Sequence, residues 1–358
     1  MMSTDKEARI YWELARHLDR LPGGFGTQDP AVERRLLEQL FTLEEAKLAT
    51  CLTIEREDAA TVAARAGLSI NEVESRLDRM AEKGLIFSAQ SEQGVLVYQA
   101  VPWVIGIYEF QIGRLDEALL QDISRYWRDR KPLTRPSGPQ MRTIPIRESI
   151  NMQLEVLPYE QVDALIAAED RFAVAPCICR QTAKMAGWGC DAPEETCLSF
   201  GEFADYYIRT GRGKPIDRDQ VNEILRRANE ASLVLQPSNS KEAAFICCCC
   251  GCCCGILEDI RHRPKPSEAV VNAFIAHLDP DLCENCEICL ERCQMGALST
   301  GATYVVLDTD CCIGCGLCVS TCPTEALTLK RKPERPELEP PQTFDDTLRK
   351  IMEIQGTQ

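Results

Sequence analysis

Eight cysteines near the C-terminus repeat one spacing twice, and this spacing suits metal–sulfur chemistry. The segment CENCEICLERC places its cysteines as C-x2-C-x2-C-x3-C, and the segment CIGCGLCVSTCP repeats the pattern 29 residues later. Three cysteines within seven residues wrap the backbone around one face of an iron–sulfur cubane, and the fourth begins a helix that leads away. Zinc sites usually pair two C-x2-C units across a longer gap, which this pattern lacks. The spacing therefore predicts two [4Fe–4S] clusters.

Residues around the cysteines repeat as well. Leu278-Asp279 and Ala297-Leu298 in the first copy correspond to Leu307-Asp308 and Ala326-Leu327 in the second, so each copy predicts strand, cysteine loop, short helix and strand. Over about residues 270 to 330 the chain resembles bacterial two-cluster ferredoxins, in which the fourth cysteine of each run ligates the other cluster. The resemblance implies two ligand sets, Cys283, Cys286, Cys289 and Cys322 for the first cluster and Cys312, Cys315, Cys318 and Cys293 for the second.

Two residues in this segment need a separate interpretation. Gln294 follows Cys293, where the ferredoxins usually carry proline, so the turn after Cys293 departs from their pattern. Cys311 is a spare thiol beside the predicted ligand Cys312. We interpret Cys311 as a packed thiol and not as a fifth ligand.

A second cysteine system lies upstream, in PCICRQTAKMAGWGCDAPEETCLSFG and in FICCCCGCCCG, where seven of eight consecutive residues are cysteine. Neighbouring side chains of an extended chain point to opposite sides, so the run cannot direct all its thiols at one metal. We predict one or two additional iron–sulfur clusters held by a subset of Cys177, Cys179, Cys190, Cys197, Cys247, Cys249, Cys250, Cys252, Cys253 and Cys254. A zinc site and reduced structural thiols are the alternatives.

The stretch from Pro176 to Cys322 looks like a family of uncharacterised iron–sulfur proteins of anaerobic bacteria and archaea. That family shares the CxCR segment, a CLSFG-like segment, a cysteine-packed run and a ferredoxin module, and the resemblance brings no known reaction with it. Arg180, directly after the CxC motif, could neutralise part of a cluster's negative charge, with Lys184 one helical turn away. Two solvated cations are the alternative.

Composition narrows the class of protein. The chain has 358 residues, 21 cysteines and a formal net charge of −15. It opens on a charged amphipathic segment without an apolar signal region, so we expect a cytoplasmic protein with reduced cysteines. Its longest apolar stretch, VLVYQAVPWVIGIYEF, is interrupted by Gln99, Pro102 and Glu109, and we expect no membrane span. The negative charge argues against nucleic acid as a partner.

The N-terminal part carries a different pattern. Residues 43–83 predict three helices, with a turn at Gly67, an N-cap at Ser69 and a stop at Gly84, and a hairpin follows around residues 92–94. Three helices and a hairpin resemble a winged helix-turn-helix domain. The helix that would contact DNA, residues 71–83, is acidic on balance, so we favour a protein-docking or structural role and consider DNA binding unlikely.

These patterns together predict a multidomain α+β protein. The expected parts are an N-terminal helical segment (1–34), a winged-helix-like domain (35–130), a linker (131–150), a cysteine-rich α/β metal-binding domain (151–268), a dicluster domain with the duplicated βαβ arrangement of ferredoxins (269–330), and a linker with a C-terminal helix (331–358). The last helix could dock on its own chain or on a partner.

We predict a carrier of low-potential electrons, to or from a partner oxidoreductase, more readily than an enzyme in its own right. A redox-sensing transcription regulator and an iron–sulfur enzyme with a catalytic middle cluster are the alternatives. The chain has neither a G-x-G-x-x-G nor a G-x-x-x-x-G-K-[ST] fingerprint, and no catalytic residue or small-molecule substrate is predicted.

Overall fold

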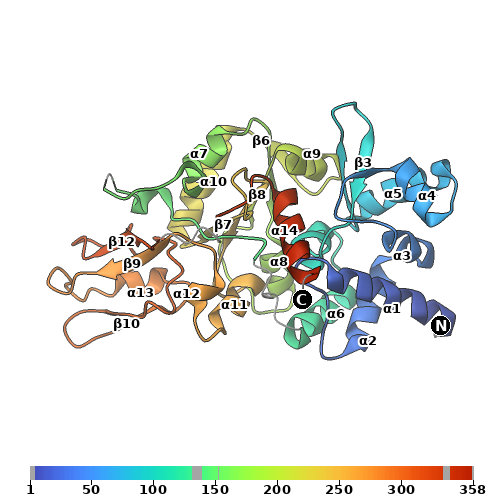
Figure 1. Cartoon of the computed structure of the whole chain (residues 1–358). Coiled ribbons are helices and arrows are strands. Elements are labelled where there is room, and N and C mark those ends of the chain that lie inside the picture. Colours follow the sequence, from blue (N-terminus) through green and yellow to red (C-terminus); the bar gives the residue numbers. More distant parts are fainter. Residues whose placement is uncertain (1–4, 131–138, 152, 334–338, 357–358) are drawn as a thin grey trace.

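The computed structural model describes residues 5–130, 139–151, 153–333 and 339–356. Figure 1 shows the N-terminal region at one end, a five-stranded sheet in the middle and the C-terminal cysteine-rich region at the other end. None of the described helices is long and apolar enough to cross a membrane. The chain is thus a mixed α+β protein of several regions.

The N-terminal region packs helices against a small antiparallel sheet of order β1-β3-β2. Helix α5 ends at Gly84, whose φ of 74° is the left-handed conformation that glycine adopts readily. The predicted boundary at residue 34 lies inside α2, and α1, α2 and the later helices share one core. The elements are α1 (Asp5–Arg20), α2 (Pro30–Leu40), α3 (Leu43–Ala49), β1 (Glu57–Asp58), α4 (Ala59–Ala66), α5 (Ile70–Lys83), β2 (Phe87–Gln90), β3 (Leu96–Gln99), η1 (Trp103–Ile107), η2 (Glu109–Gln111) and α6 (Glu117–Asp129).

The middle region is built on one sheet of order β6-β4-β5-β8-β7. All four strand pairings are antiparallel, so the region differs from the predicted α/β class, in which crossover helices join parallel strands. Its elements are η3 (Arg147–Ser149), η4 (Pro158–Glu160), α7 (Val162–Ala167), β4 (Phe172–Pro176), α8 (Ile178–Met185), β5 (Glu195–Phe200), α9 (Gly201–Arg209), β6 (Lys214–Ile216), α10 (Arg218–Glu230), β7 (Val234–Pro237), β8 (Phe245–Cys249), α11 (Gly255–Arg261) and α12 (Pro266–Ala269).

Local signals explain how this sheet brings the cysteines together. Asp217 caps α10 through a capping box with Gln220, and β7 then returns the chain to the sheet beside β8. Strand β4 ends directly before Cys177, and β5 places Cys197 opposite Cys247 of β8. Residues 131–138 of the predicted linker lie outside the described residues, but Ile144 beyond them is buried and donates its backbone N–H to Leu235 of β7.

The C-terminal cysteine-rich region comprises β9 (Phe274–Leu278), α13 (Ile288–Arg292), β10 (Leu298–Ser299), β11 (Val306–Leu307) and β12 (Leu327–Arg331). Strand β9 pairs with β12 and β10 with β11, both antiparallel. The second copy has hydrogen-bonded turns over residues 317–321 where the sequence predicts a short helix.

The left-handed residues of this region recur at the 29-residue offset of the cysteines. Asn285, Glu287 and Gly296 have positive φ in the first copy, and Gly314, Gly316 and Glu325 have it in the second. Left-handed backbone is rare for residues other than glycine, so its recurrence indicates that both loops need the same path.

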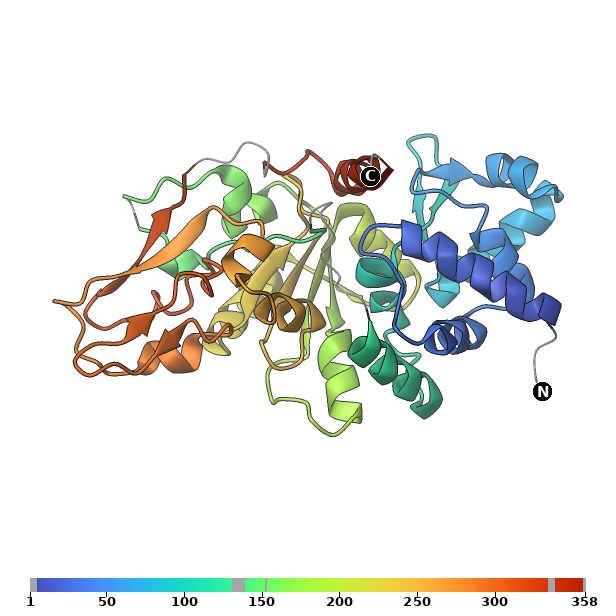
Figure 2. The ribbon, with the colours of Figure 1, turned by 60° about the horizontal axis from the view of Figure 1, so that its bottom comes forward.

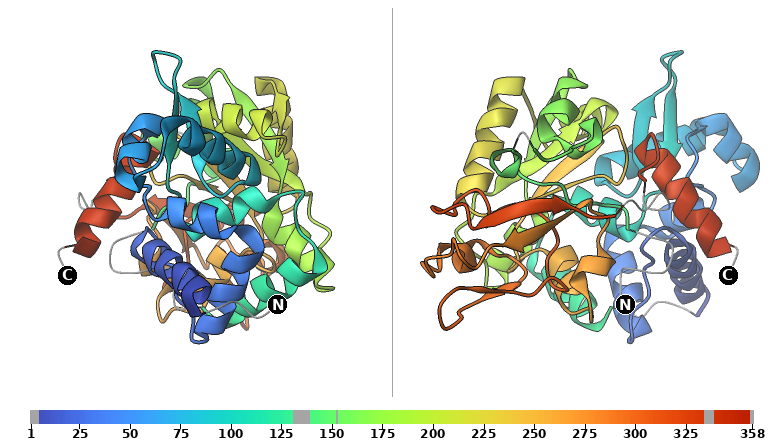
Figure 3. Two further views of the ribbon diagram at one scale, coloured as in Figure 1. Left: turned by 90° about the vertical axis from the view of Figure 1, so that its right-hand side faces the viewer. Right: turned by 60° about the vertical axis from the view of Figure 1, so that its left-hand side comes forward.

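The last helix, α14 (Phe344–Gly356), docks on its own chain. Phe344 packs against Phe203 and Phe245 of the middle region, and Arg349 pairs with Glu55 of the N-terminal region. Figure 2 shows α14 at the junction of these two regions, and both views of Figure 3 place it on the outside of the molecule.

Candidate metal centres

The four thiols predicted for the first ferredoxin cluster lie close enough to affect one another. Burial first, then the charges of Cys286, Cys322 and Cys283, raise the pKa of Cys289 to about 11. Cys289 is buried and Cys286 is exposed, so this set lies at the surface. The structure brings the four thiols together, and their role as ligands stays a prediction.

The four thiols predicted for the second cluster line a cavity of about 20 Å³, namely Cys293, Cys312, Cys315 and Cys318. Backbone N–H groups point at two of these sulfurs, from Ala297 to Cys293 Sγ (3.2 Å) and from Ala276 to Cys312 Sγ (3.4 Å). Thiol donors with hydrogen bonds to their sulfurs suit an iron–sulfur cluster. Cys311 instead contacts the Asp308 carboxylate (3.4 Å) and does not line this cavity.

The ten predicted middle ligands separate into two sets. Nine cysteines line a cavity of about 40 Å³, Cys248, Cys250 and Cys253 among them, and this volume exceeds the ~10–15 Å³ that a water molecule needs. Hydrogen bonds between neighbouring thiols join six of the nine in a series that runs Cys177, Cys179, Cys254, Cys249, Cys247 and Cys197. We call this set the six-thiol chamber. Cys248, between Cys247 and Cys249 on β8, is not hydrogen-bonded in the series, because alternate residues of a strand face opposite sides.

Two thiols of the chamber favour the thiolate form that binds metals. Hydrogen bonds from Cys197 and Cys249 hold the pKa of Cys247 well below its usual value. Those from Cys179 and Cys249 lower the pKa of Cys254 to about 5. Burial opposes both shifts. Hydrogen bonds to neighbouring thiols and burial raise the pKa values of the other four thiols of the chamber, so these must lose their protons when a metal binds.

Arg180 supplies positive charge beside the chamber. Its side chain is fully buried, donates to the backbone oxygen of Cys248 (3.2 Å) and lies 3.6 Å from Cys250 Sγ. Among the described residues no carboxylate forms an ion pair with Arg180. A buried guanidinium needs a counter-charge, so thiolates or a negatively charged cluster are suited to provide it. Lys184, its predicted neighbour, pairs instead with Glu194 at the surface.

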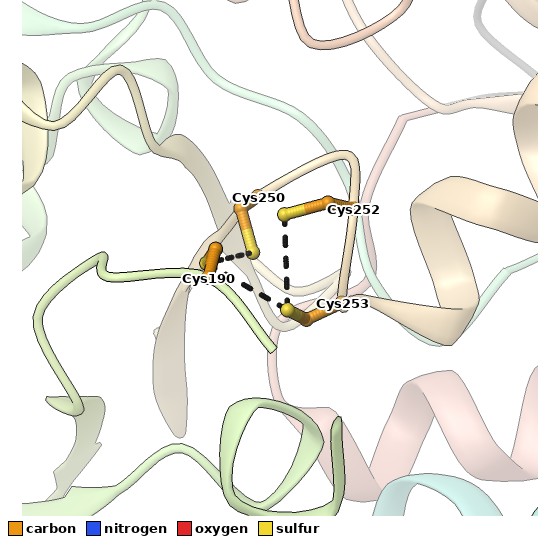
Figure 4. Close-up of side chains that lie close together, drawn as sticks. All are labelled: Cys190, Cys250, Cys252 and Cys253. Carbon is orange, nitrogen blue, oxygen red and sulfur yellow. Dashed lines mark hydrogen bonds between the residues drawn. The ribbon is translucent and has the colours of Figure 1, made fainter. Parts of the chain in front are cut away.

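The remaining four thiols form a tight group, shown in Figure 4. The sulfurs of Cys190, Cys250, Cys252 and Cys253 all lie within 4.8 Å of one another. Three of them come from the turn after β8, and Cys190 comes from the loop between α8 and β5. We call this group the four-thiol site.

A hydrogen bond connects the four-thiol site to the C-terminal cysteine-rich region, residues 270–330, which we call the ferredoxin segment. Gly251 donates its backbone N–H to Gln294 Oε1 (2.7 Å), and Gln294 follows the predicted second-cluster ligand Cys293. A Cβ on Gly251 would lie 2.3 Å from the Gln294 backbone oxygen, so glycine is required for this approach. Nearby, Arg292 bonds to Asn229 at the end of α10 and to the Leu317 oxygen.

Sequence reasoning missed Glu109, which lines the chamber from the N-terminal region. Burial raises the pKa of Glu109 to about 8, although the Gly106 N–H donates to its carboxylate (2.8 Å). The available signal was a carboxylate inside an apolar stretch. Ile105 and Ile112 also line the chamber, so the N-terminal region contributes part of its wall.

Comparison with known families finds a 4Fe-4S binding domain at residues 305–328. This match contains Cys312, Cys315, Cys318 and Cys322, so the chain carries a segment of the kind that binds [4Fe–4S] clusters. No curated protein matches the chain, and no solved structure does either.

Proposed function

We propose that this protein transfers electrons through two [4Fe–4S] clusters in the ferredoxin segment and a further iron–sulfur cluster in the six-thiol chamber. The observation that carries the proposal is the Gly251–Gln294 hydrogen bond, because it joins the loop of a predicted ferredoxin ligand to the turn that leads to the chamber thiol Cys254, three residues after Gly251. Met295, Ile313 and Leu317 pack in one core with Cys250 and Cys254, so no solvent layer separates the two parts. Iron–sulfur clusters supply one-electron redox chemistry, and the protein supplies their ligands and burial.

The two ends of this path differ in exposure. At the first-cluster end Cys286 is exposed, and Leu282 and Ile288 beside it are 49% and 43% exposed. Asp281, Glu284 and Glu287 are exposed and neighbour these residues along the chain, so a redox partner with a basic surface would fit here. At the other end, Ile105, Glu109 and Ile112 line the chamber.

A redox-sensing regulator receives less support. The exposed charges of α5 are Glu72, Glu74, Arg79 and Glu82, which would repel DNA phosphates on balance. The Arg76 and Lys83 cations of the same helix pair with Glu72 and Glu45. Helix α9 covers another part of this region, since Tyr206 bonds to the Ala81 and Ile86 backbone oxygens.

The test is iron and labile sulfide per chain in anaerobically reconstituted protein, with spin quantitation after dithionite reduction. We expect about twelve irons per chain in the wild type and about eight in Cys179→Ala/Cys254→Ala. Cys248→Ala is the matched control, since it removes a buried thiol of the same strand that is outside the series, and it should keep about twelve irons. Fewer than about eight irons in the wild type, or clusters that accept no electrons, would disprove electron transfer through the ferredoxin segment. A chamber variant with undiminished iron would disprove the further cluster alone.

A further inference from the structure

The four-thiol site differs from the other cysteine groups in how closely its sulfurs approach. The sulfur–sulfur distances are 3.8 Å for Cys190–Cys250, 3.7 Å for Cys190–Cys253 and 3.7 Å for Cys252–Cys253. Four thiolates bound tetrahedrally to one ion at about 2.3 Å have their sulfurs about 3.8 Å apart. These three distances therefore match the geometry of a single metal ion.

The predicted cluster ligands do not have this spacing. In a four-iron cube each thiolate binds a different iron, so the sulfurs lie farther apart than around one ion. Within the described part of the chain, Cys190, Cys250, Cys252 and Cys253 are the one group of three or more possible ligands with all donor atoms within 4.8 Å. The eight ferredoxin cysteines and the six-thiol chamber contain no such group among the described residues.

We propose that Cys190, Cys250, Cys252 and Cys253 bind one zinc ion as a structural tetrathiolate site. All four donors are thiols, and tetrahedral sulfur coordination is typical of zinc when no iron–sulfur core is present. Zinc binding displaces the thiol protons to solvent and involves no oxidation or reduction. This assignment does not rest on the proposed electron transfer, because zinc has no redox chemistry.

The surroundings of the four-thiol site show which segments a zinc ion would connect. Residues 186–194 form neither helix nor strand, and residues 184–189 are exposed, with Trp188 at 56%. Cys190 is only partly exposed and is the residue by which this loop reaches the 250–253 turn. That turn contacts the ferredoxin segment through Gly251. A zinc ion would thus fix the loop between α8 and β5 and the turn that faces Gln294.

Charge around the site is also compatible with a tetrathiolate. Four thiolates and one divalent ion leave a net negative charge, and the buried Arg180 lies 3.6 Å from Cys250 Sγ.

The experiment measures zinc and iron per chain in anaerobically purified wild type, Cys252→Ser and Cys311→Ser. Cys252 is exposed, so serine is tolerated there, and Cys311 is a partly exposed thiol outside every group, which makes it the matched control. We expect about one zinc per chain in the wild type and the control. In Cys252→Ser we expect at least a fivefold loss of zinc with unchanged iron. Loss of iron without loss of zinc would assign the site to a cluster and overturn the proposal, as would a wild type without zinc.

A second measurement needs no variant and therefore holds even if Cys252→Ser fails to fold. X-ray absorption at the zinc edge of the intact wild type should show four sulfur neighbours at about 2.3 Å. Nitrogen or oxygen neighbours would overturn the assignment to these four thiols. A chain that has zinc but no reducible iron would support this site and disprove the electron-transfer proposal, so the two failures are distinguishable.

Discussion

The two cysteine-rich regions hold their thiols in opposite ways. In the ferredoxin segment the thiols lie on loops and on the five-residue helix α13, and the strands β10 and β11 have two residues each. The two small apolar clusters there include six of the eight predicted ligands. In the middle region the thiols lie on or beside strands of a five-stranded sheet with a large apolar core. In the first region the metal must supply much of the core, whereas in the second the polypeptide assembles the ligands before any metal binds.

Removal of iron should therefore produce the largest difference between the two regions in their rates of hydrogen exchange. After chelation under reducing conditions, we expect amides of residues 281–326 to exchange at least about 100-fold faster, equivalent to about 3 kcal/mol, because metal-binding free energy is folding free energy there. Amides of β7 and α10 should change little, since Val221, Leu225 and Val234 are buried among apolar side chains that the polypeptide itself supplies, and β7 keeps its backbone pairing with β8. Hydrogen exchange read by mass spectrometry measures both.

The proposed difference between the two regions is wrong if the amides of both lose their protection from hydrogen exchange together, since the middle sheet would then also need metal to fold. Equal retention of protection in both would show that the ferredoxin loops are stable without clusters. Residues 5–100 serve as an internal control, because their only cysteine, Cys51, belongs to no thiol group and none of them lines the chamber.

Replacement of the buried cation tests the middle region specifically. Arg180→Met keeps much of the side-chain volume but removes the charge beside the chamber, and loss of one member of a buried charged group costs about 3–5 kcal/mol. We expect iron to fall by about four per chain while the ferredoxin spectrum stays. Iron analysis with low-temperature electron paramagnetic resonance provides the measurement.

The matched control is Arg292→Met in the ferredoxin segment. Arg292 is partly exposed and mainly bonds to neutral groups, Asn229 and the Leu317 oxygen, so its loss should cost about 1–3 kcal/mol without loss of iron. Equal effects of the two substitutions would contradict the special role of Arg180. Arg180→Lys, which keeps the charge, should retain more iron than Arg180→Met.

The same contrast explains how far the sequence alone could be interpreted. The eight ferredoxin cysteines, matched in part by a 4Fe-4S binding domain, were recognisable because their spacing is local along the chain. The separation of the middle thiols was not predictable, because it depends on the register of β5 against β8, which sets Cys197 opposite Cys247. Glu109 comes from a distant segment, and no local spacing relates it to a thiol. In the sequence, Gln294 was recognisable only as a departure from the proline that ferredoxins usually carry there. Its hydrogen bond with Gly251 could not be predicted, because the two residues meet only in the folded chain.

The contact between Gly251 and Gln294, which joins the two regions, can be disrupted by adding a single Cβ atom. Gly251→Ala would place a Cβ 2.3 Å from the Gln294 backbone oxygen, and overpacking of this kind costs about 1–3 kcal/mol. We expect the 250–257 and 293–298 segments to exchange faster together, with iron content unchanged. Gly296→Ala is the control: it meets nothing within 4 Å but has φ of +66°, so only its own turn should loosen. A response in both segments for the control would refute a specific contact at Gly251.

The smallest effect is expected for Cys311→Ser, which separates a spare thiol from a ligand in the ferredoxin segment. Cys311 Sγ lies 3.4 Å from Asp308 Oδ2, and a serine hydroxyl can donate to the same carboxylate. Burial and Asp308 raise the pKa of Cys311, so its thiol is the protonated form and a poor ligand. Stability should change by less than about 0.5 kcal/mol, and iron, sulfide and the reduced-state spectrum should equal those of the wild type. A loss of about four irons would make Cys311 a ligand in place of Cys312 and would break the 29-residue repeat on which the ferredoxin assignment depends.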